Sequence, residues 1–372
     1  MILVMSEVVS LSCIRDGVSG LLFAVFQIFG ILLPGTAGIL LIGWKKELSW
    51  RACAFSFVLG YCISLFEYFI IMLLGLRLYV PYIVVVVATI SGFYIYRKIQ
   101  SFELIKDDEV RDSDTKVIWV FAGVIFLTAL VASCFNNLVQ PVVNESSPAN
   151  DLMYWVGNII ELTKEFPPKD FTKYPNVLTY HYFSSAQLAL ISLFTKIRPI
   201  YMGLFFSVVQ SVLLRVFCGY LVITKCTREL KLRIFGMIIL FFSSGFEREV
   251  FITYLAHSYH APFGVEYGLS IFLIFLYLLI IKSEEKTNRL KTSILIWACL
   301  FVLAGEKIPY GGIALLGLGI LCIGFLFTKQ YVKAFITGLP ALAIFVVEYF
   351  TMINLSRFVN NPNSNGSITN FM

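Results

Sequence analysis

Charged side chains are scarce in this sequence. Only 14% of its 372 residues are charged, whereas 58% are hydrophobic, and the mean hydropathy is +0.83. Water-soluble domains usually contain about 25% charged and about 45–50% apolar residues. A fold surrounded by water could not bury so much apolar surface. The composition therefore excludes an ordinary soluble protein and predicts that lipid surrounds much of the chain.

Several motifs of soluble enzymes are also missing. The sequence has no Walker loop, no GxGxxG turn and no Ser-His-Asp pattern, which disfavours an enzyme driven by a nucleotide. Its eight cysteines form no CxxC pair, and most lie in apolar runs, so we interpret them as small core residues. The first residues lack the order of a cleavable signal peptide, so the first long apolar run is predicted to be a retained helix.

Long apolar runs are what the sequence has in abundance. A helix needs about 20 apolar residues to cross a bilayer. Ten candidate spans are present: 18–43, 52–76, 78–96, 117–139, 200–224, 234–246, 265–281, 292–304, 311–328 and 334–353. The runs 234–246 and 292–304 are short and must extend into flanking residues or end within the protein. The sequence thus predicts an all-α, polytopic integral membrane protein of the cell membrane, with about ten transmembrane helices.

Lysines and arginines predict the orientation of these helices. Although the net charge is +6, the basic residues gather in short segments between the spans, where anionic lipid headgroups rather than nucleic acid are the expected neighbours. Short basic loops usually stay in the cytoplasm. The basic segments are 45–51, 97–116, 225–233, 282–291 and 329–333. Both termini are therefore predicted to lie outside.

This topology divides the chain into four parts. Residues 1–100 form N-terminal transmembrane helices, 101–116 a cytoplasmic linker, and 117–353 a transmembrane core with a large outer loop at 140–199. Residues 354–372 form a polar, Asn-rich tail, which we interpret as disordered or as the beginning of an outer domain.

The outer loop is predicted to contain two helices that do not cross the membrane. Asn150 can cap the first one, which ends at Pro167-Pro168. Its apolar residues recur at helical spacing and predict a face lying on the membrane. These residues are Leu152, Trp155, Ile159 and Leu162. The stretch Ser184–Ile197, with 14 residues, is too short for a span and is predicted to be an amphipathic or re-entrant helix at the outer interface.

Polar residues with possible chemistry gather in the predicted outer segments. All three histidines lie there, as do two basic residues: His181, His257, His260, Arg248 and Lys307. The two cations suit an anionic phosphate, since stabilising departing negative charge is a large catalytic term, but lipid headgroups are an alternative partner. His257 and His260 have the spacing of two metal ligands. No third ligand is evident, so hydrogen bonding to substrate or backbone is preferred and no metal or cofactor is predicted.

Asp151 begins the first helix of the outer loop and has two interpretations. A carboxylate at this position is favoured by the helix dipole alone. It could also act as a general base that takes the proton from an acceptor hydroxyl, with Glu145 as a local substitute. Three further charges, Glu67, Arg215 and Glu348, lie within predicted spans, where charges mark either functional sites or structural ion pairs.

The segment from Asn150 to Ile197 carries a family resemblance. Its sequence, NDLMYWVGNIIEL…FPPKDF…YPNVLTYHYFSSAQLALISLFTKI, resembles GT-C-type membrane glycosyltransferases, the superfamily of protein O-mannosyltransferases and lipid A aminoarabinose transferases. In that superfamily, a large outer loop contains an acidic residue, which is followed by interfacial helices and then by a histidine-containing stretch. Asp151 matches the acid and Tyr180-His181 the histidine stretch. Gly305-Glu306-Lys307-Ile308-Pro309 is similar to the family's outer lysine-containing turn.

The resemblance covers roughly residues 117–353, and the family's usual C-terminal part has no counterpart, as in a truncated member. It implies that a sugar moves from a polyprenyl-phosphate donor to an unknown cell-envelope acceptor on the outer face of the cytoplasmic membrane. It also implies that Asp151 is the base, that Lys307 and Arg248 hold the lipid phosphate, and that His181 positions the donor or acceptor.

Two other classes of membrane protein are alternatives. A lipid-linked glycan polymerase, ligase or flippase handles the same lipids, and a transporter is a further possibility. Transporters usually show discontinuous helices and polar groups near the membrane midplane. In this sequence the polar groups gather at the outer rim, which favours an interfacial enzyme.

Overall fold

The computed structural model describes residues 18–42, 50–99, 150–170, 182–242, 265–284 and 290–349, and isolated positions between 120 and 178. In these residues the secondary structure is helical, without a strand. Seven of the helices are long and apolar enough to cross a membrane. The prediction of an all-α, polytopic membrane protein is therefore confirmed. The number of ten spans stays a prediction, because 117–139 lies almost wholly outside the described residues.

The helices begin and end within a few residues of the predicted spans. The long ones are Val18–Leu41, which includes η1 (Gln27–Leu32) and α2 (Leu33–Leu41), α3 (Trp50–Leu73), α4 (Val80–Ile99), α10 (Ser207–Cys226), α13 (Val265–Glu284), α15 (Ile308–Phe327) and α16 (Tyr331–Glu348). The short ones are η2 (Arg77–Tyr79), α7 (Asn150–Lys164), α8 (Phe183–Thr195), α9 (Pro199–Tyr201), η4 (Met202–Phe206), α11 (Leu230–Phe242) and α14 (Leu290–Glu306).

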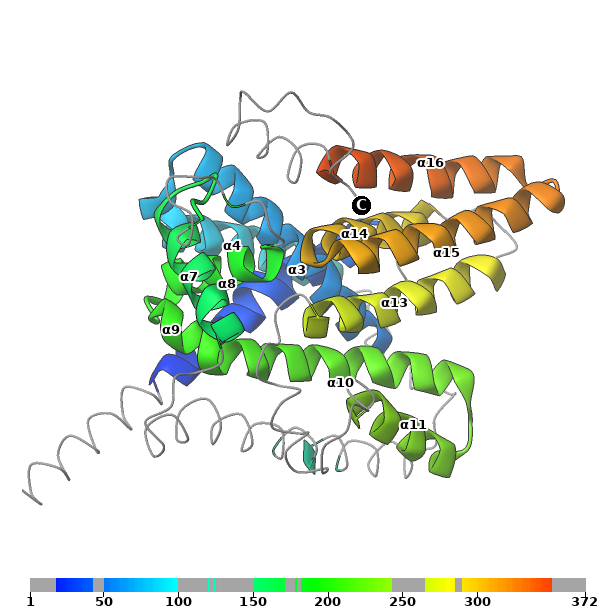
Figure 1. The fold of residues 1–372 in the computed structure, drawn as a ribbon, viewed down its shortest axis with the longest axis horizontal. Helices are drawn as coiled ribbons and strands as arrows, with labels where there is room; N and C mark the ends of the chain where they lie inside the picture. Colours follow the sequence, from blue (N-terminus) through cyan, green and yellow to red (C-terminus); the bar gives the residue numbers. More distant parts are fainter. Residues whose placement is uncertain are drawn as a thin grey trace, which may run out of the picture.

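Most long helices and the shorter α14 run side by side. Figure 1 shows α10, α13, α14, α15 and α16 lying along one direction, and each packs on its neighbours. The helix α3 joins this bundle to the N-terminal helices, because it packs on α2 and η1 as well as on α10 and α14. The resulting core is rich in aromatic residues, as expected for a protein that contains 35 phenylalanines.

Small residues let the N-terminal helices approach closely. A Cβ atom at Gly35 would lie 1.7 Å from the carbonyl oxygen of Ser56, and one at Gly60 would lie 2.0 Å from that of Ile31. Helices in lipid associate through such backbone contacts, because lipid tails provide no hydrophobic drive for association. These two glycines therefore place α3 directly against η1 and α2.

The bundle has two chemically different ends. At one end the ion pair between Lys225 and Glu284, 2.8 Å apart, joins α10 to α13, and the turn at 328–330 joins α15 to α16. The described parts of the basic segments 225–233, 282–291 and 329–333 thus share this end, as the predicted topology requires. We call the opposite end, with α7, α8 and the α14–α15 turn at Lys307, the outer end.

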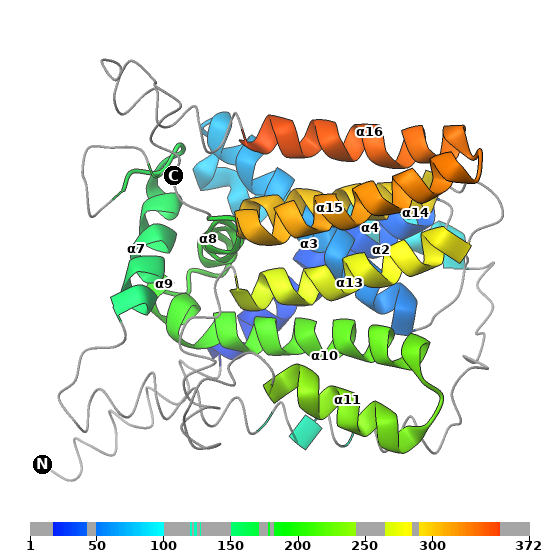
Figure 2. The same ribbon diagram turned by 45° about the vertical axis from the view of Figure 1, so that its right-hand side comes forward.

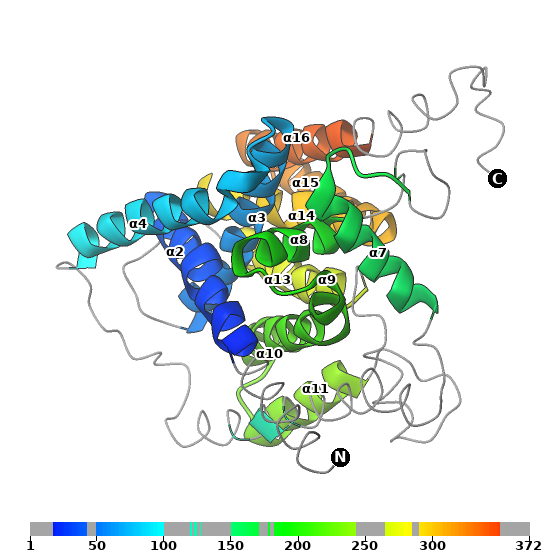
Figure 3. The same cartoon turned by 90° about the vertical axis from the view of Figure 1, so that its left-hand side faces the viewer.

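The short helices α7 and α8 lie across the outer end. Figure 2 shows α8 end-on where the bundle helices lie in the plane, and Figure 3 shows α7, α8 and α9 in front of the bundle. With 13 residues, α8 extends over only about 20 Å, whereas the hydrocarbon core is about 30 Å thick. Its length and direction agree with the prediction that Ser184–Ile197 does not span the membrane.

The surroundings of these two helices differ from the prediction. The apolar face of α7 was expected on the membrane, but Trp155, Ile159 and Leu162 are buried within the protein. Likewise α8 is buried from Phe183 to Ser192, which disagrees with the amphipathic alternative and leaves the re-entrant one as a prediction. The physical reason is that α8 packs on α7, α3, α4 and α14, so protein takes the place of lipid on both helices.

Candidate functional site

A buried carboxylate lies at the outer end of the bundle. Glu306 is the last residue of α14 and is 1% exposed. Its Oε1 accepts a hydrogen bond of 2.6 Å from the hydroxyl of Tyr61 on α3. Within the described part of the chain, its Oε2 has no hydrogen-bond partner. A buried carboxylate with one free oxygen is costly, because charge removed from water needs compensation.

The N-terminus of α8 approaches the same carboxylate. Ser184, the second residue of α8, interacts with Glu306 through its backbone and its hydroxyl. The unpaired N–H groups at a helix N-terminus favour a negative charge. The contact is tight, since a Cβ atom at Gly305 would lie 2.2 Å from the ring of Phe183. The first turn of α8 is therefore held against the last turn of α14.

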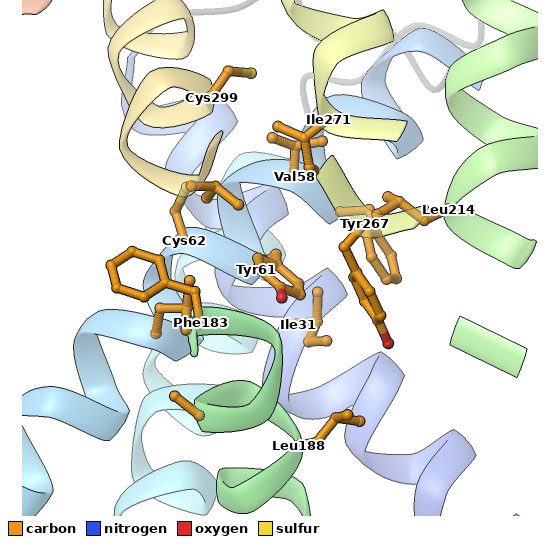
Figure 4. Close-up of a cluster of buried hydrophobic side chains, with 14 of the residues drawn as sticks. Ile31, Val58, Tyr61, Cys62, Phe183, Leu188, Leu214, Tyr267, Ile271 and Cys299 are labelled. Atoms are coloured by element: carbon orange, nitrogen blue, oxygen red, sulfur yellow. The ribbon is translucent and has the colours of Figure 1, made fainter. Parts of the chain in front are cut away.

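A second polar network lies deeper in the bundle. The hydroxyl of Tyr267 on α13 donates to Gln210 Oε1 on α10 at 2.6 Å, and Gln210 Nε2 donates to Gln27 Oε1 at 3.1 Å. Tyr267 also lies beside Tyr61, with ring centroids 5.9 Å apart. Figure 4 shows both tyrosines among aliphatic side chains such as Val58 and Ile271. Polar atoms thus continue from Glu306 towards the interior.

Irregular helix geometry accompanies this second network. Gln27 is the first residue of the π-helix η1, and Ser207, whose carbonyl accepts from Tyr267 at 3.2 Å, directly follows the π-helix η4. A π-helical turn widens the helix and is frequent at functional sites. The two irregular segments bring polar groups of Val18–Leu41 and α10 together.

Another buried carboxylate, Glu348, lies near the start of α8. It is the last residue of α16 and is 5% exposed, and neither of its oxygens has a partner among the described residues. Burial raises the pKa of Tyr182, which precedes α8, and the charge of Glu348 raises that pKa further. Glu348 therefore lies close to Tyr182, on the side of α8 where Glu306 meets Ser184.

The structure describes only some of the predicted site residues. Lys307 is half-buried at the outer end, directly after Glu306 and before the first turn of α15. Asp151 lies in the first turn of α7, which crosses the same end, and its side chain is outside the described part. The other four predicted residues also lie outside the described residues: His181, Arg248, His257 and His260. The structure thus brings Lys307 and α7 to one end, and the roles of all six residues stay predictions.

Sequence reasoning gave no role to most groups of this site. Tyr61 and Tyr267 stand in long apolar runs, where an aromatic residue is usually interpreted as core or interface. Glu306 could have been found from the sequence, because it is a carboxylate at the end of an apolar run and lies beside Lys307. Its partner Tyr61 is separated from it by 245 positions, and no local pattern joins them.

Two other charges that the sequence places within spans, Arg215 and Glu67, also lie in the described residues. Arg215 is fully buried in α10. Glu67 lies near the outer end of α3, where neither of its oxygens has a partner in the described segments. No cluster of three or more His, Cys, Asp and Glu side chains with the arrangement of a metal site occurs in the described segments.

The fold and the site define a class of protein, an α-helical membrane protein with polar groups enclosed at one end. The comparisons with known proteins find no matching family model, no matching curated protein and no matching solved structure. The resemblance to GT-C-type glycosyltransferases therefore stays a hypothesis from the residue pattern.

Proposed function

We propose that the protein is a glycosyltransferase of the cell membrane that moves a sugar from a polyprenyl-phosphate donor to an acceptor at the outer end. The observation that carries the proposal is the placement of α7 and α8 across this end, beside the turn that contains Lys307. A lipid-linked donor keeps its phosphate at the membrane surface. Groups that act on that phosphate must therefore lie at the end of a bundle rather than at its centre.

Lys307 is the proposed phosphate-binding residue. It lies at the N-terminus of α15, a helix of 20 residues, where the helix dipole also favours an anion. Its ammonium group would attract the donor phosphate and stabilise the charge that develops when the phosphate departs. In the same proposal Arg248 assists Lys307, and the three histidines hold the donor or acceptor: His181, His257 and His260.

One observation favours a second candidate, a flippase or transporter of the same lipids. Gln210 lies about 17 Å along the helix from Pro199, so the network of Tyr267, Gln210 and Gln27 reaches far into the bundle beside two π-helical segments. Polar groups at interrupted helices near the midplane are typical of transporters. A test of the proposed function must therefore measure translocation of the lipid as well as transfer of the sugar.

The test uses the full chain in lipid vesicles with polyprenyl-phosphate sugars. We expect transfer by the native protein, and Lys307→Ala should raise the KM for the donor at least about tenfold, because a charge-assisted contact contributes about 1.5–3 kcal/mol. Lys329→Ala, at the opposite end, is the matched control and should leave KM unchanged. Translocation of the lipid without sugar transfer would refute the transferase and support the second candidate.

A further inference from the structure

We propose that Glu306 is the proton acceptor of the transfer reaction, held by Tyr61 and by the first turn of α8. This inference rests on the proposed function and assigns the catalytic base of that same site. The sequence alone favours Asp151 for this role. The contacts of Glu306 make it the stronger candidate.

The first argument is the hydrogen bonding of the carboxylate. Tyr61 holds Oε1, while Oε2 is buried and has no partner among the described residues. A carboxylate that served only to anchor α8 would be expected to have both oxygens satisfied, since unmet buried groups are destabilising. Among the described residues, the arrangement instead fixes one oxygen and leaves the other without a partner, so that it can accept a proton.

The second argument is the position relative to the phosphate-binding residue. In this reaction the acceptor oxygen attacks the anomeric carbon, which is bonded to the phosphate. The base must therefore lie within one sugar ring of the group that holds the phosphate. Glu306 and Lys307 are consecutive residues, with Cα atoms about 3.8 Å apart. Lys307 has an extended backbone, with φ −161° and ψ 120°, at the break between α14 and α15.

The third argument is the set of groups around Glu306. Ser184 stabilises its charge from α8, and Tyr61 and Tyr267 lie close by on α3 and α13. Lys307 is the adjacent cation in sequence. The neutral donors around Glu306 favour its charged form, whereas burial, the larger effect, favours the protonated form. None of these donors forms an ion pair that would block the free oxygen.

The chemical step balances with these groups. The acceptor hydroxyl oxygen forms a bond to the anomeric carbon of the sugar. The bond from that carbon to the phosphate oxygen breaks, and polyprenyl phosphate leaves with the electron pair beside Lys307. The hydroxyl proton passes to Oε2 of Glu306, and no oxidant or reductant is needed.

Kinetics of paired variants test the assignment. Glu306→Gln keeps the size of the side chain and an oxygen for Tyr61 but is a poor base, so kcat should fall about 10²–10⁴-fold while the donor KM changes little. Glu67 is half-buried near the outer end of α3, and its enclosed carboxyl oxygens also have no partner among the described residues. Glu67→Gln is therefore the matched control and should keep the native kcat. A native kcat for Glu306→Gln in an active preparation would overturn the assignment and leave the proposed function standing. Absence of transfer by the native protein would overturn both.

Chemical labelling gives a readout that does not depend on turnover. A hydrophobic carbodiimide reacts with protonated carboxyl groups in apolar surroundings, and peptide mass spectrometry locates the product. We expect modification of Glu306 that polyprenyl phosphate suppresses, because the bound lipid covers the neighbouring Lys307. Modification of Glu306 that polyprenyl phosphate does not suppress would show that the carboxyl group lies away from the donor, and no modification would show that small molecules do not reach it. Either result would overturn the inference.

Discussion

At the scale of single residues, the contact between Tyr61 and Glu306 decides the character of the outer end. It is a hydrogen bond between two fully buried groups from α3 and α14, in surroundings where water cannot replace a lost partner. A buried acceptor that loses its donor becomes destabilising by about 1–3 kcal/mol. The same bond that orients the carboxylate therefore also stabilises the fold.

Replacing Tyr61 by Phe should thus lower the stability of the protein by about 1–3 kcal/mol, because Glu306 loses its hydrogen-bond donor. The measurement is the midpoint of thermal unfolding of the purified protein in detergent. Tyr82→Phe is the control, since Tyr82 is 71% exposed on α4 and its hydroxyl makes no such buried contact. Equal midpoints for Tyr61→Phe and the native protein would contradict the structure.

At the scale of helices, close packing positions the elements that hold the site. The helix α3 carries Tyr61, and α3 is placed by the contacts of Gly60 with Ile31 and of Gly35 with Ser56. The atoms in contact are backbone atoms, which cannot rotate away as a flexible side chain could. A methyl group added there must separate the helices.

Gly60→Ala should therefore destabilise the protein by more than the about 1–3 kcal/mol of ordinary overpacking. Reduced yield and a lower unfolding midpoint are the expected observations. Gly319→Ala is the matched control, because nothing lies within 4 Å of a Cβ atom there. Since alanine favours helix by up to about 1 kcal/mol over glycine, the control should be neutral or slightly stabilising. Identical effects of both substitutions would show that α3 does not pack on η1 as described.

At the scale of the whole molecule, the two ends of the bundle are predicted to lie on opposite sides of the membrane. Arg198 follows α8 at the outer end and is exposed, and Lys329 is exposed at the α15–α16 turn of the basic end. If α8 does not span, as its 13 residues indicate, these two positions are predicted to lie on opposite sides of the membrane. The positive-inside tendency puts Lys329 in the cytoplasm.

Cysteine labelling in intact cells tests this topology. In a background without native cysteines, an impermeant maleimide should modify Arg198→Cys directly and Lys329→Cys only after the membrane is permeabilised. Both variants should react equally after permeabilisation, which serves as the control for thiol reactivity. Direct labelling of Lys329→Cys with protection of Arg198→Cys would invert the predicted orientation.

The sequence by itself determined the class of fold and the bounds of most helices. Apolar runs of spanning length are visible without any contact information, since lipid requires them to be long and continuous. The short length of Ser184–Ile197 likewise indicated a helix that does not span, and the 13 residues of α8 agree with this prediction. Basic segments indicated which loops share a side, and the described ones do.

Only the tertiary structure decided what surrounds the short helices and which polar groups meet. An apolar face has the same pattern whether it touches lipid or protein, so Trp155 and Ile159 were assigned to the membrane although they are buried within the protein. Glu306 and Tyr61 meet because α3 and α14 pack together, and that packing depends on side-chain shape over distant segments. Hydropathy contains no information about such contacts, because it describes each segment's preference for lipid and not its neighbour.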